Sequence, residues 1–174
     1  RMGANIKIKN QRESSGETIV DLEVRHAQLK GVEVDARDVV FAIDEIPILA
    51  IASCVAEGET IIRGAAELRV KESDRLEMTA AILKSFGVDL EEFEDGMKIV
   101  GKPEMAGKIL SEQEVSQVRS EANVWRVCGD HRIAMCGAVL EFVRIGEFRL
   151  DDLGAVETSF PNFIKCFQTL TSEK

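Results

Sequence analysis

Two short segments of the sequence are apolar on every side of a helical wheel, and they limit the folds that the chain can adopt. They are Ile46–Ala56, which reads IPILAIASCVA, and Ile133–Leu140, which reads IAMCGAVL. A short helix that is apolar all round must be buried all round. The segment Arg75–Phe86 instead keeps a polar side. The sequence therefore predicts an α/β fold with some helices inside a shell of strands and amphipathic helices, and not a doubly wound sheet.

Glycines and changes of periodicity divide the chain into alternating strands and helices. The predicted strands are 6–9, 19–26, 31–35, 60–63 and 148–150, with a hairpin of 89–94 and 97–100 turned by Asp95-Gly96. The predicted helices are 44–57, 72–86, 131–144 and 161–170. The units look like degenerate repeats within a single domain of residues 1–174, in which the polar residues 104–127 are interpreted as an insert.

The first eight residues, RMGANIKI, follow the pattern of a helix end, a glycine stop and a strand. The same pattern recurs at Ser85–Leu90, where a helix is predicted before it. The chain is therefore expected to be a portion of a longer polypeptide.

The composition excludes several classes of partner. The net charge is -9 and the pI is near 4.9, which disfavours binding to nucleic acid or to anionic membranes. No apolar run reaches membrane-spanning length. The four cysteines have no partners at metal-ligand spacing, so we interpret them as reduced thiols of a cytoplasmic protein and expect no metal site.

Charged residues gather at the starts of three predicted helices. These clusters are Asp44-Glu45, the segment RVKESDR at Arg69–Arg75, and Asp130-His131-Arg132. A helix N-terminus is a favourable seat for an anion, whereas Arg and Lys there run against the helix dipole. Cations in a locally unfavourable place suggest that they serve a ligand. A solvated charged turn is the alternative interpretation for any one cluster.

If the helices run parallel, the three clusters lie at one end of the domain. Arg75 and Arg132 are then predicted to clamp a phosphate or carboxylate, with Lys71 as a point charge beside them. The candidates for proton transfer are Asp44 and Glu72. His131 is a rival base, although a His beside Asp and Arg is more often a structural hydrogen-bonding residue.

Four motifs resemble the 5-enolpyruvylshikimate-3-phosphate synthase family. They are RVKESDR at Arg69–Arg75, GDHRIAM at Gly129–Met135, DEIPILA at Asp44–Ala50 and SFPNF at Ser159–Phe163. Their order and spacing also agree, except over 104–127. The resemblance implies a two-domain enzyme of repeated βαβαββ units, with buried parallel helices surrounded by sheets, of which this chain is most of the C-terminal portion.

The resemblance also implies a reaction and roles for residues. Such an enzyme transfers the enolpyruvyl group of phosphoenolpyruvate to shikimate 3-phosphate, releases phosphate and needs no cofactor. By motif position Asp44 is the base at the shikimate hydroxyl, and Lys71 holds shikimate 3-phosphate and assists proton transfer. Glu72 is the acid or base at the methylene carbon, and Arg75 and Arg132 grip phosphoenolpyruvate.

Two positions depart from the family's pattern. Thr158 stands where the family often has a lysine that reaches phosphoenolpyruvate, and Glu67 stands where other members carry an asparagine that touches shikimate 3-phosphate. The family's other domain also contributes residues that this chain lacks. The chain is therefore expected to supply about half of a site and to be inactive by itself.

Two alternatives remain at this point. The first is the sister enzyme that acts on UDP-N-acetylglucosamine, although RVKESDR followed by GDHR argues against it. The second, from a different class, is a non-catalytic module that binds anions.

Overall fold

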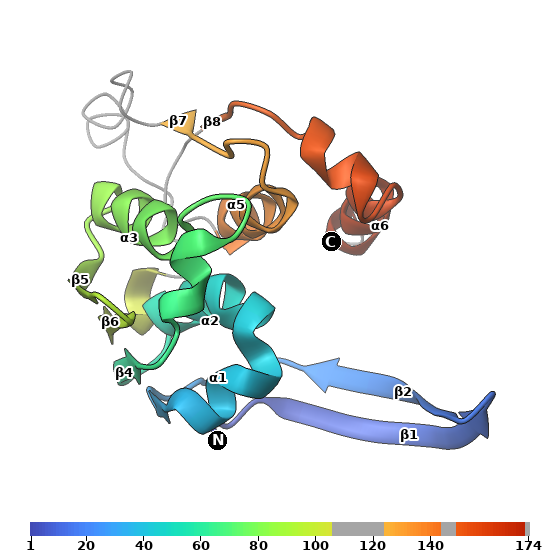
Figure 1. Cartoon of the computed structure of the whole chain (residues 1–174). Helices are drawn as coiled ribbons and strands as arrows, with labels where there is room; N and C mark the ends of the chain where they lie inside the picture. Colours follow the sequence, from blue (N-terminus) through green and yellow to red (C-terminus); the bar gives the residue numbers. More distant parts are fainter. Residues whose placement is uncertain (106–123, 144–148, 173–174) are drawn as a thin grey trace.

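The computed structural model describes residues 1–105, 124–143 and 149–172 of the chain (Figure 1). The strands are β1 (Asn5–Ser14), β2 (Glu17–Arg25), β3 (Glu33–Val34), β4 (Gly58–Ile62), β5 (Asp89–Phe93), β6 (Gly96–Gly101), β7 (Val124–Trp125) and β8 (Arg149–Leu150). The α-helices are α1 (Ala36–Ala42), α2 (Ile46–Cys54), α3 (Arg75–Ser85), α5 (His131–Val143) and α6 (Phe163–Ser172). Short 3-10 helices are η1 (Ile43–Glu45), η2 (Ala66–Val70), η3 (Pro103–Met105) and η5 (Gly154–Thr158).

A four-stranded sheet lies along one side of a group of packed helices. Its strand order is β3-β4-β6-β5, with β3 parallel to β4 and the remaining pairs antiparallel. Helices α2 and α3 pack against the sheet, and α5 packs against both of these helices (Figure 1). Ile62, Met97 and Ile99 of the sheet are buried and belong to the same hydrophobic core as the helices.

The two apolar segments form α2 and α5, the helices at the centre of this core. In α5, Ile133, Ala134 and Leu140 are fully buried. In α2, Ala50 and Ile51 are fully buried, whereas the opposite side of the helix is only half-buried. The expectation that α2 is buried on all sides is therefore wrong for the side that carries Ile48, Leu49 and Ala52. No helix in the described ranges has the length and apolar character needed to cross a membrane.

The hairpin β1–β2 extends away from the rest of the molecule (Figure 1). It is antiparallel, with Ile6 opposite Val24 and Ile8 opposite Leu22, and β1 continues to Ser14, beyond the predicted strand 6–9. All four of these aliphatic side chains are exposed.

Three helix starts differ from the sequence-based expectation, and the helix predicted from residue 161 begins at Phe163 as α6. The helix predicted from Asp44 begins at Ile46. An additional short helix, α1, precedes it. This helix begins after Asp35, because the Asp35 side chain accepts hydrogen bonds from the N–H groups of Arg37 and Asp38 in a capping box. The helix predicted from Glu72 begins at Arg75, since the Asp74 side chain accepts from the N–H of Glu77 at 2.8 Å.

The hairpin β5–β6 exists as predicted, but its turn residues are Glu94 and Asp95, because Gly96 already pairs with Phe93. Gly96 is required for a different reason. A Cβ atom there would lie 2.0 Å from the carbonyl oxygen of Ile62 in the neighbouring strand. Most of the predicted insert, residues 106–123, lies outside the described residues.

Candidate active site

The starts of α2, α3 and α5 meet, and they bring Asp44, Arg75 and Arg132 together. The Arg75 Nη1 group donates to Asp44 Oδ1 at 2.9 Å, and the Arg132 Nη2 atom lies 3.3 Å from Asp44 Oδ2. The backbone carbonyl of Asp44 also accepts from Arg132 Nη1 at 3.2 Å. Residues that are 31 and 88 positions from Asp44 in the chain thus share its carboxylate and carbonyl.

Arg75 is the most buried of these cations, with 2% of its side chain exposed. Besides Asp44 it donates to Glu72 at 2.6 Å and to Asp130 at 2.8 Å. Burial opposes its charge, but the hydrogen bond to Asp130 and the negative charges of Asp130, Glu72 and Asp44 outweigh this effect and raise the pKa of Arg75. An incoming anion that binds Arg75 must displace one of them, and Glu72 is the most exposed.

Asp130 is a central residue that the sequence-based prediction left without a role. Its side chain is fully buried and accepts from Arg75, from the Ser73 hydroxyl at 2.9 Å and from the Arg132 N–H at 2.9 Å. Burial raises the pKa of Asp130, but the hydrogen bonds from Arg75 and Ser73 dominate and lower it overall. The signal in the sequence was an acidic residue directly before a buried helix, in the N-cap position.

Lys71 and Glu72 lie in the loop before α3 and not inside the helix. The Lys71 ammonium group donates to the carboxylate of Glu67, which stands in η2, and this hydrogen bond raises the pKa of Lys71. Lys71 therefore carries a full positive charge beside the site, with Glu67 as its present partner.

Arg69, the first residue of the RVKESDR motif, has its hydrogen-bond partners outside the group formed by Asp44, Arg75 and Arg132. Its guanidinium group donates to Asp74 and Glu92, each at 3.0 Å, and to the carbonyl oxygens of Phe93 and Glu94. The hydrogen bond to Asp74 and that to Glu92 raise its pKa. Arg69 thus fixes the motif loop to the turn of the β5–β6 hairpin.

The structure also places His131 and Thr158, the residue that stands where the family often has a lysine. His131 is the first residue of α5 and is half-buried; within the described ranges no hydrogen bond or ion pair of its side chain is present. Thr158 ends η5, and its hydroxyl donates to the carbonyl of Ala155 at 2.7 Å.

The charge cluster has an excess of negative charge. It contains five carboxylates and three cations, a formal net charge of -2 with His131 neutral: Asp44, Glu45, Glu67, Glu72, Asp130, Lys71, Arg75 and Arg132. Like charges disfavour one another, so this cluster alone is poorly suited to hold a multiply charged anion. In the described part of the chain, no group of three or more His, Cys, Asp and Glu residues is arranged to hold a metal ion.

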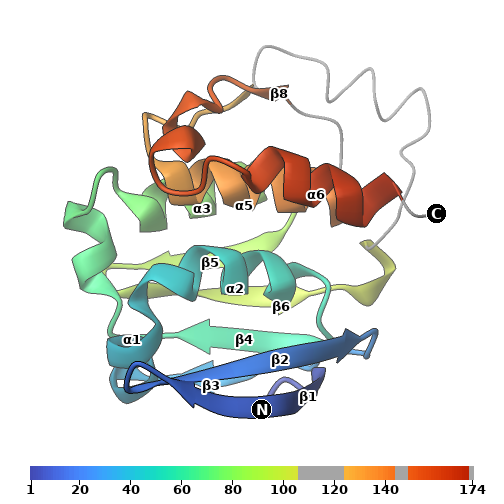
Figure 2. The ribbon, with the colours of Figure 1, turned by 90° about the vertical axis from the view of Figure 1, so that its right-hand side faces the viewer.

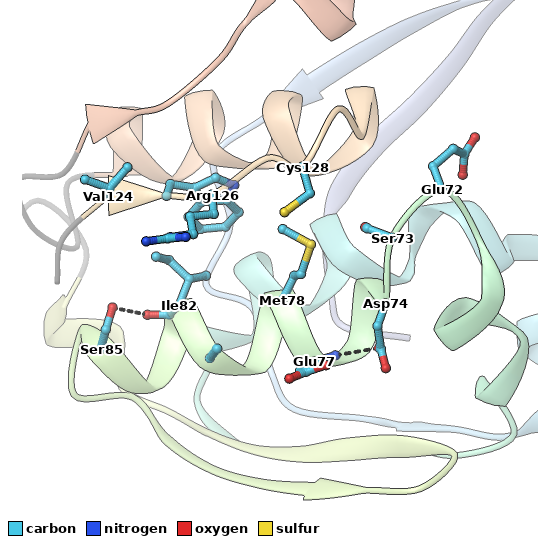
Figure 3. Close-up of a pocket in the computed structure, with 12 residues that line it drawn as sticks. Glu72, Ser73, Asp74, Glu77, Met78, Ile82, Ser85, Val124, Arg126 and Cys128 are labelled. Carbon is cyan, nitrogen blue, oxygen red and sulfur yellow. Dashed lines mark hydrogen bonds between the residues drawn. The ribbon is translucent and has the colours of Figure 1, made fainter.

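A cavity of about 570 Å³ lies beside the cluster, between α3 and the β7 segment (Figure 3). Figure 3 shows Met78 and Ile82 of α3 facing Arg126 and Cys128 across it. Glu72 and Ser73 line one end, but Asp44, Lys71 and Arg132 do not line it. The cavity therefore adjoins the candidate site without containing its cations.

Comparison with solved structures identifies the fold. Two structures of EPSP synthase from Acinetobacter baumannii superpose on 98% and 97% of this chain with TM-scores of 0.81 and 0.79, at 37% and 34% sequence identity. The chain covers 36% of each. The fold is thus that of the enolpyruvyl transferases, and the predicted fold class is confirmed.

The sequence comparisons narrow this class to one family. The family model of EPSP synthase (3-phosphoshikimate 1-carboxyvinyltransferase) matches residues 1–167, and the chain belongs to this family. The 3-phosphoshikimate 1-carboxyvinyltransferases of Syntrophomonas wolfei and Rhizobium johnstonii are 43% and 44% identical to it over 98% and 94% of its length. The chain spans only 37% and 34% of these two relatives.

Proposed function

We propose that the chain forms one wall of an active site that transfers the enolpyruvyl group of phosphoenolpyruvate to shikimate 3-phosphate and releases phosphate, a step in the biosynthesis of aromatic amino acids. The observation that carries the proposal is the carboxylate of Asp44 held between the guanidinium groups of Arg75 and Arg132 where three helices begin. Carboxylate and phosphate groups are the ligands that arginine binds in bidentate fashion.

The proposed reaction proceeds by addition and then elimination. The methylene carbon of phosphoenolpyruvate gains a proton from Glu72 while the substrate hydroxyl loses its proton to Asp44 and its oxygen bonds to the neighbouring carbon. In the second step that carbon loses phosphate, and the new methyl group returns a proton to the Glu72 carboxylate, which restores the double bond. Each assisted proton transfer typically contributes roughly 10²–10⁴-fold to the rate.

The remaining residues serve binding in this proposal. Arg132, with 31% of its side chain exposed, reaches phosphoenolpyruvate directly, and Arg75 does so when Glu72 turns away from it. Lys71 exchanges Glu67 for the phosphate of shikimate 3-phosphate. His131 at the start of α5 completes the binding wall.

The excess negative charge of the cluster indicates that the active site needs cations from a second part of the protein. Both substrates are multiply charged anions, and the cluster of this chain has a net charge of -2. We propose that residues 1–174 form the C-terminal portion of a two-domain enzyme, and that further cations come from the part of the family's polypeptide outside the match. Neither nucleic acid nor membrane is a partner in this proposal. A cytoplasmic location is proposed because all four cysteines are free thiols.

A chimeric protein tests the proposed reaction. This chain replaces the matching segment of the Syntrophomonas wolfei relative, and phosphate release is measured with both substrates. We expect turnover that Asp44→Asn lowers by about 100-fold or more. The exposed carboxylate of Asp21, in the β1–β2 hairpin, provides the control variant Asp21→Asn, which should retain the rate.

The alternatives give different outcomes. An active chimera in which Asp44→Asn leaves the rate unchanged contradicts the role of Asp44. Calorimetric titration of this chain with phosphoenolpyruvate, shikimate 3-phosphate and UDP-N-acetylglucosamine tests the two alternatives, the sister enzyme and the non-catalytic module. Binding of the last compound alone favours the sister reaction, and binding of simple anions by the chain with an inactive chimera favours a non-catalytic module.

A further inference from the structure

Ser73 links the loop that carries Glu72 to the buried part of the charge cluster. It lies in the loop of residues 71–74, between η2 and α3 (Figure 3). Its hydroxyl group donates to Asp130 Oδ2 at 2.9 Å, across 57 residues of the chain. In Figure 2 this loop lies at the left of the molecule, on the same side as α1, which precedes α2. The reaction proposed above gives Ser73 no role, although it is the direct neighbour of the proton donor.

The Asp130 carboxylate is a rigid support for this hydrogen bond. It is fully buried, and its Oδ1 atom accepts from the N–H groups of Arg132 at 2.9 Å and of Ile133 at 3.4 Å. Its Oδ2 atom accepts from Ser73 and also from Arg75 Nε at 2.8 Å. One oxygen atom therefore sets the position of the Ser73 hydroxyl relative to a guanidinium group that is proposed to bind phosphoenolpyruvate.

The loop is held by side chains and not by its own backbone. Within the described ranges, neither Glu72 nor Ser73 makes a hydrogen bond between backbone groups. Lys71 donates to Glu67, and Glu72 accepts from Arg75 at 2.6 Å. Both of these contacts break in the proposed reaction, because Lys71 turns to the phosphate of shikimate 3-phosphate and Glu72 turns to the methylene carbon. The hydrogen bond of Ser73 uses neither group and can persist throughout.

We propose that Ser73 is a positioning residue for proton transfer, because its hydrogen bond to Asp130 holds the loop in place while Glu72 exchanges Arg75 for the methylene carbon of phosphoenolpyruvate. This inference rests on the proposed function, in which Glu72 is the proton donor. With the next residue anchored, Glu72 moves by rotation of its side chain and not by movement of the loop. A displacement of about 1 Å near a reacting group can lower a rate by about 100-fold, so such an anchor matters for the rate.

Two variants of Ser73 and a matched control test this role. Ser73→Ala removes the hydroxyl group, whereas Ser73→Thr retains it, and the cavity of about 570 Å³ that Ser73 lines has room for the additional methyl group. Ser85→Ala is the control. Ser85 lines the other end of the same cavity, and its hydroxyl group donates to the carbonyl of Ile82 at 2.6 Å (Figure 3). The control thus also loses one hydrogen bond, but it has no link to Asp130.

The anchor is tested in this chain by NMR relaxation of the backbone N–H groups. In Ser73→Ala the order parameter of the Glu72 N–H group should fall from about 0.85, typical of a rigid backbone, to about 0.6 or lower. Ser73→Thr and Ser85→Ala should keep the native value. An unchanged order parameter in Ser73→Ala would overturn the proposal, whatever the result with substrates.

The effect on catalysis is measured in the chimera with the Syntrophomonas wolfei relative. Ser73→Ala should lower kcat about 10-fold, as expected for one hydrogen bond to a charged group, and change KM for phosphoenolpyruvate by less than about threefold. KM is retained because Arg75 and Arg132 keep their contacts with Asp44. The solvent deuterium isotope effect on kcat should rise, since proton transfer becomes slower, and a purely structural role would not change it. Ser73→Thr should restore kcat.

The outcomes separate this proposal from the proposed function. A higher KM at constant kcat, or equal losses of kcat in Ser73→Ala and Ser85→Ala, would overturn the positioning role. A native chimera without turnover would contradict the proposed function, whereas the order parameters in this chain would still decide whether Ser73 anchors the loop.

Discussion

Replacement of Asp130 by asparagine tests whether the buried charge network holds the three helix starts together. Asparagine retains the shape of aspartate and its ability to cap a helix, so that α5 keeps its N-cap. The variant loses only the negative charge that faces Arg75. The Arg75 side chain is 2% exposed, and the Asp130 carboxylate beside it is fully buried. Asp130→Asn thus isolates the charge pair from the cap.

The expected loss of stability follows from burial. Removal of one partner from a buried ion pair costs about 3–5 kcal/mol, and Arg75 keeps Asp44 and Glu72 as partners, so we expect about 3 kcal/mol. With a urea m-value of about 2 kcal/mol/M, the unfolding midpoint should fall by about 1.5 M. The exposed Asp21→Asn serves as control and should leave the midpoint unchanged.

The pH dependence provides an independent check. Because the folded-state pKa of Asp130 is lowered from the ordinary value of 3.8, its ionised form stabilises the fold above that value, and the contribution is lost as pH falls through the lower folded pKa. The difference in the free energy of unfolding between the native chain and Asp130→Asn should be constant near neutral pH and shrink below about pH 4. A midpoint that does not move at neutral pH, or a difference that grows in acid, refutes the argument.

Three further changes have defined outcomes. Glu67→Gln should lower the pKa of Lys71, measured by NMR titration of its ammonium group, and an unchanged value would show that their ion pair is absent in solution. Under native conditions a thiol reagent at pH 8 should modify only Cys128 and Cys166, because burial raises the pKa of the other two thiols to about 12; four rapid modifications would contradict the fold. Gly96→Ala should lower the free energy of unfolding by about 1–3 kcal/mol in urea titration, since its methyl group meets the backbone of β4, and a neutral effect would contradict that close approach.

The elements that the sequence predicted well are those with strong local signals. The apolar composition of α2 and α5 predicted helices of the core, and alternation predicted strands in the β1 and β2 segments. Helix starts were less predictable, because the decisive hydrogen bond of the Asp74 side chain to the N–H of Glu77 begins α3 at Arg75 and excludes Glu72 from it. An acidic or polar residue in a charged run is a cap only when the backbone turns there.

The candidate site was predictable as a set of charged residues but not as a network. The sequence placed Asp44, Arg75 and Arg132 at helix starts, and the structure joins them. It did not reveal that Asp130 is fully buried between Arg75 and Ser73, since this depends on tertiary contacts across more than fifty residues. The half-buried side of α2 was likewise hidden, because composition shows that a helix needs cover but not which chain segment supplies it.

The hydrogen bonds of Arg69 have a consequence for protein engineering. Surface hairpin turns are usually the safest places for affinity tags, labels or inserted domains. The turn between β5 and β6 is an exception. The carbonyl oxygens of Phe93 and Glu94 accept from the guanidinium group of Arg69, which also donates to Asp74 in the loop before α3. An insertion there would shift the loop that carries Lys71 and Glu72. The turn of the β1–β2 hairpin, around Ser15 and Gly16, has no such link to the charge cluster and is the better site for a label.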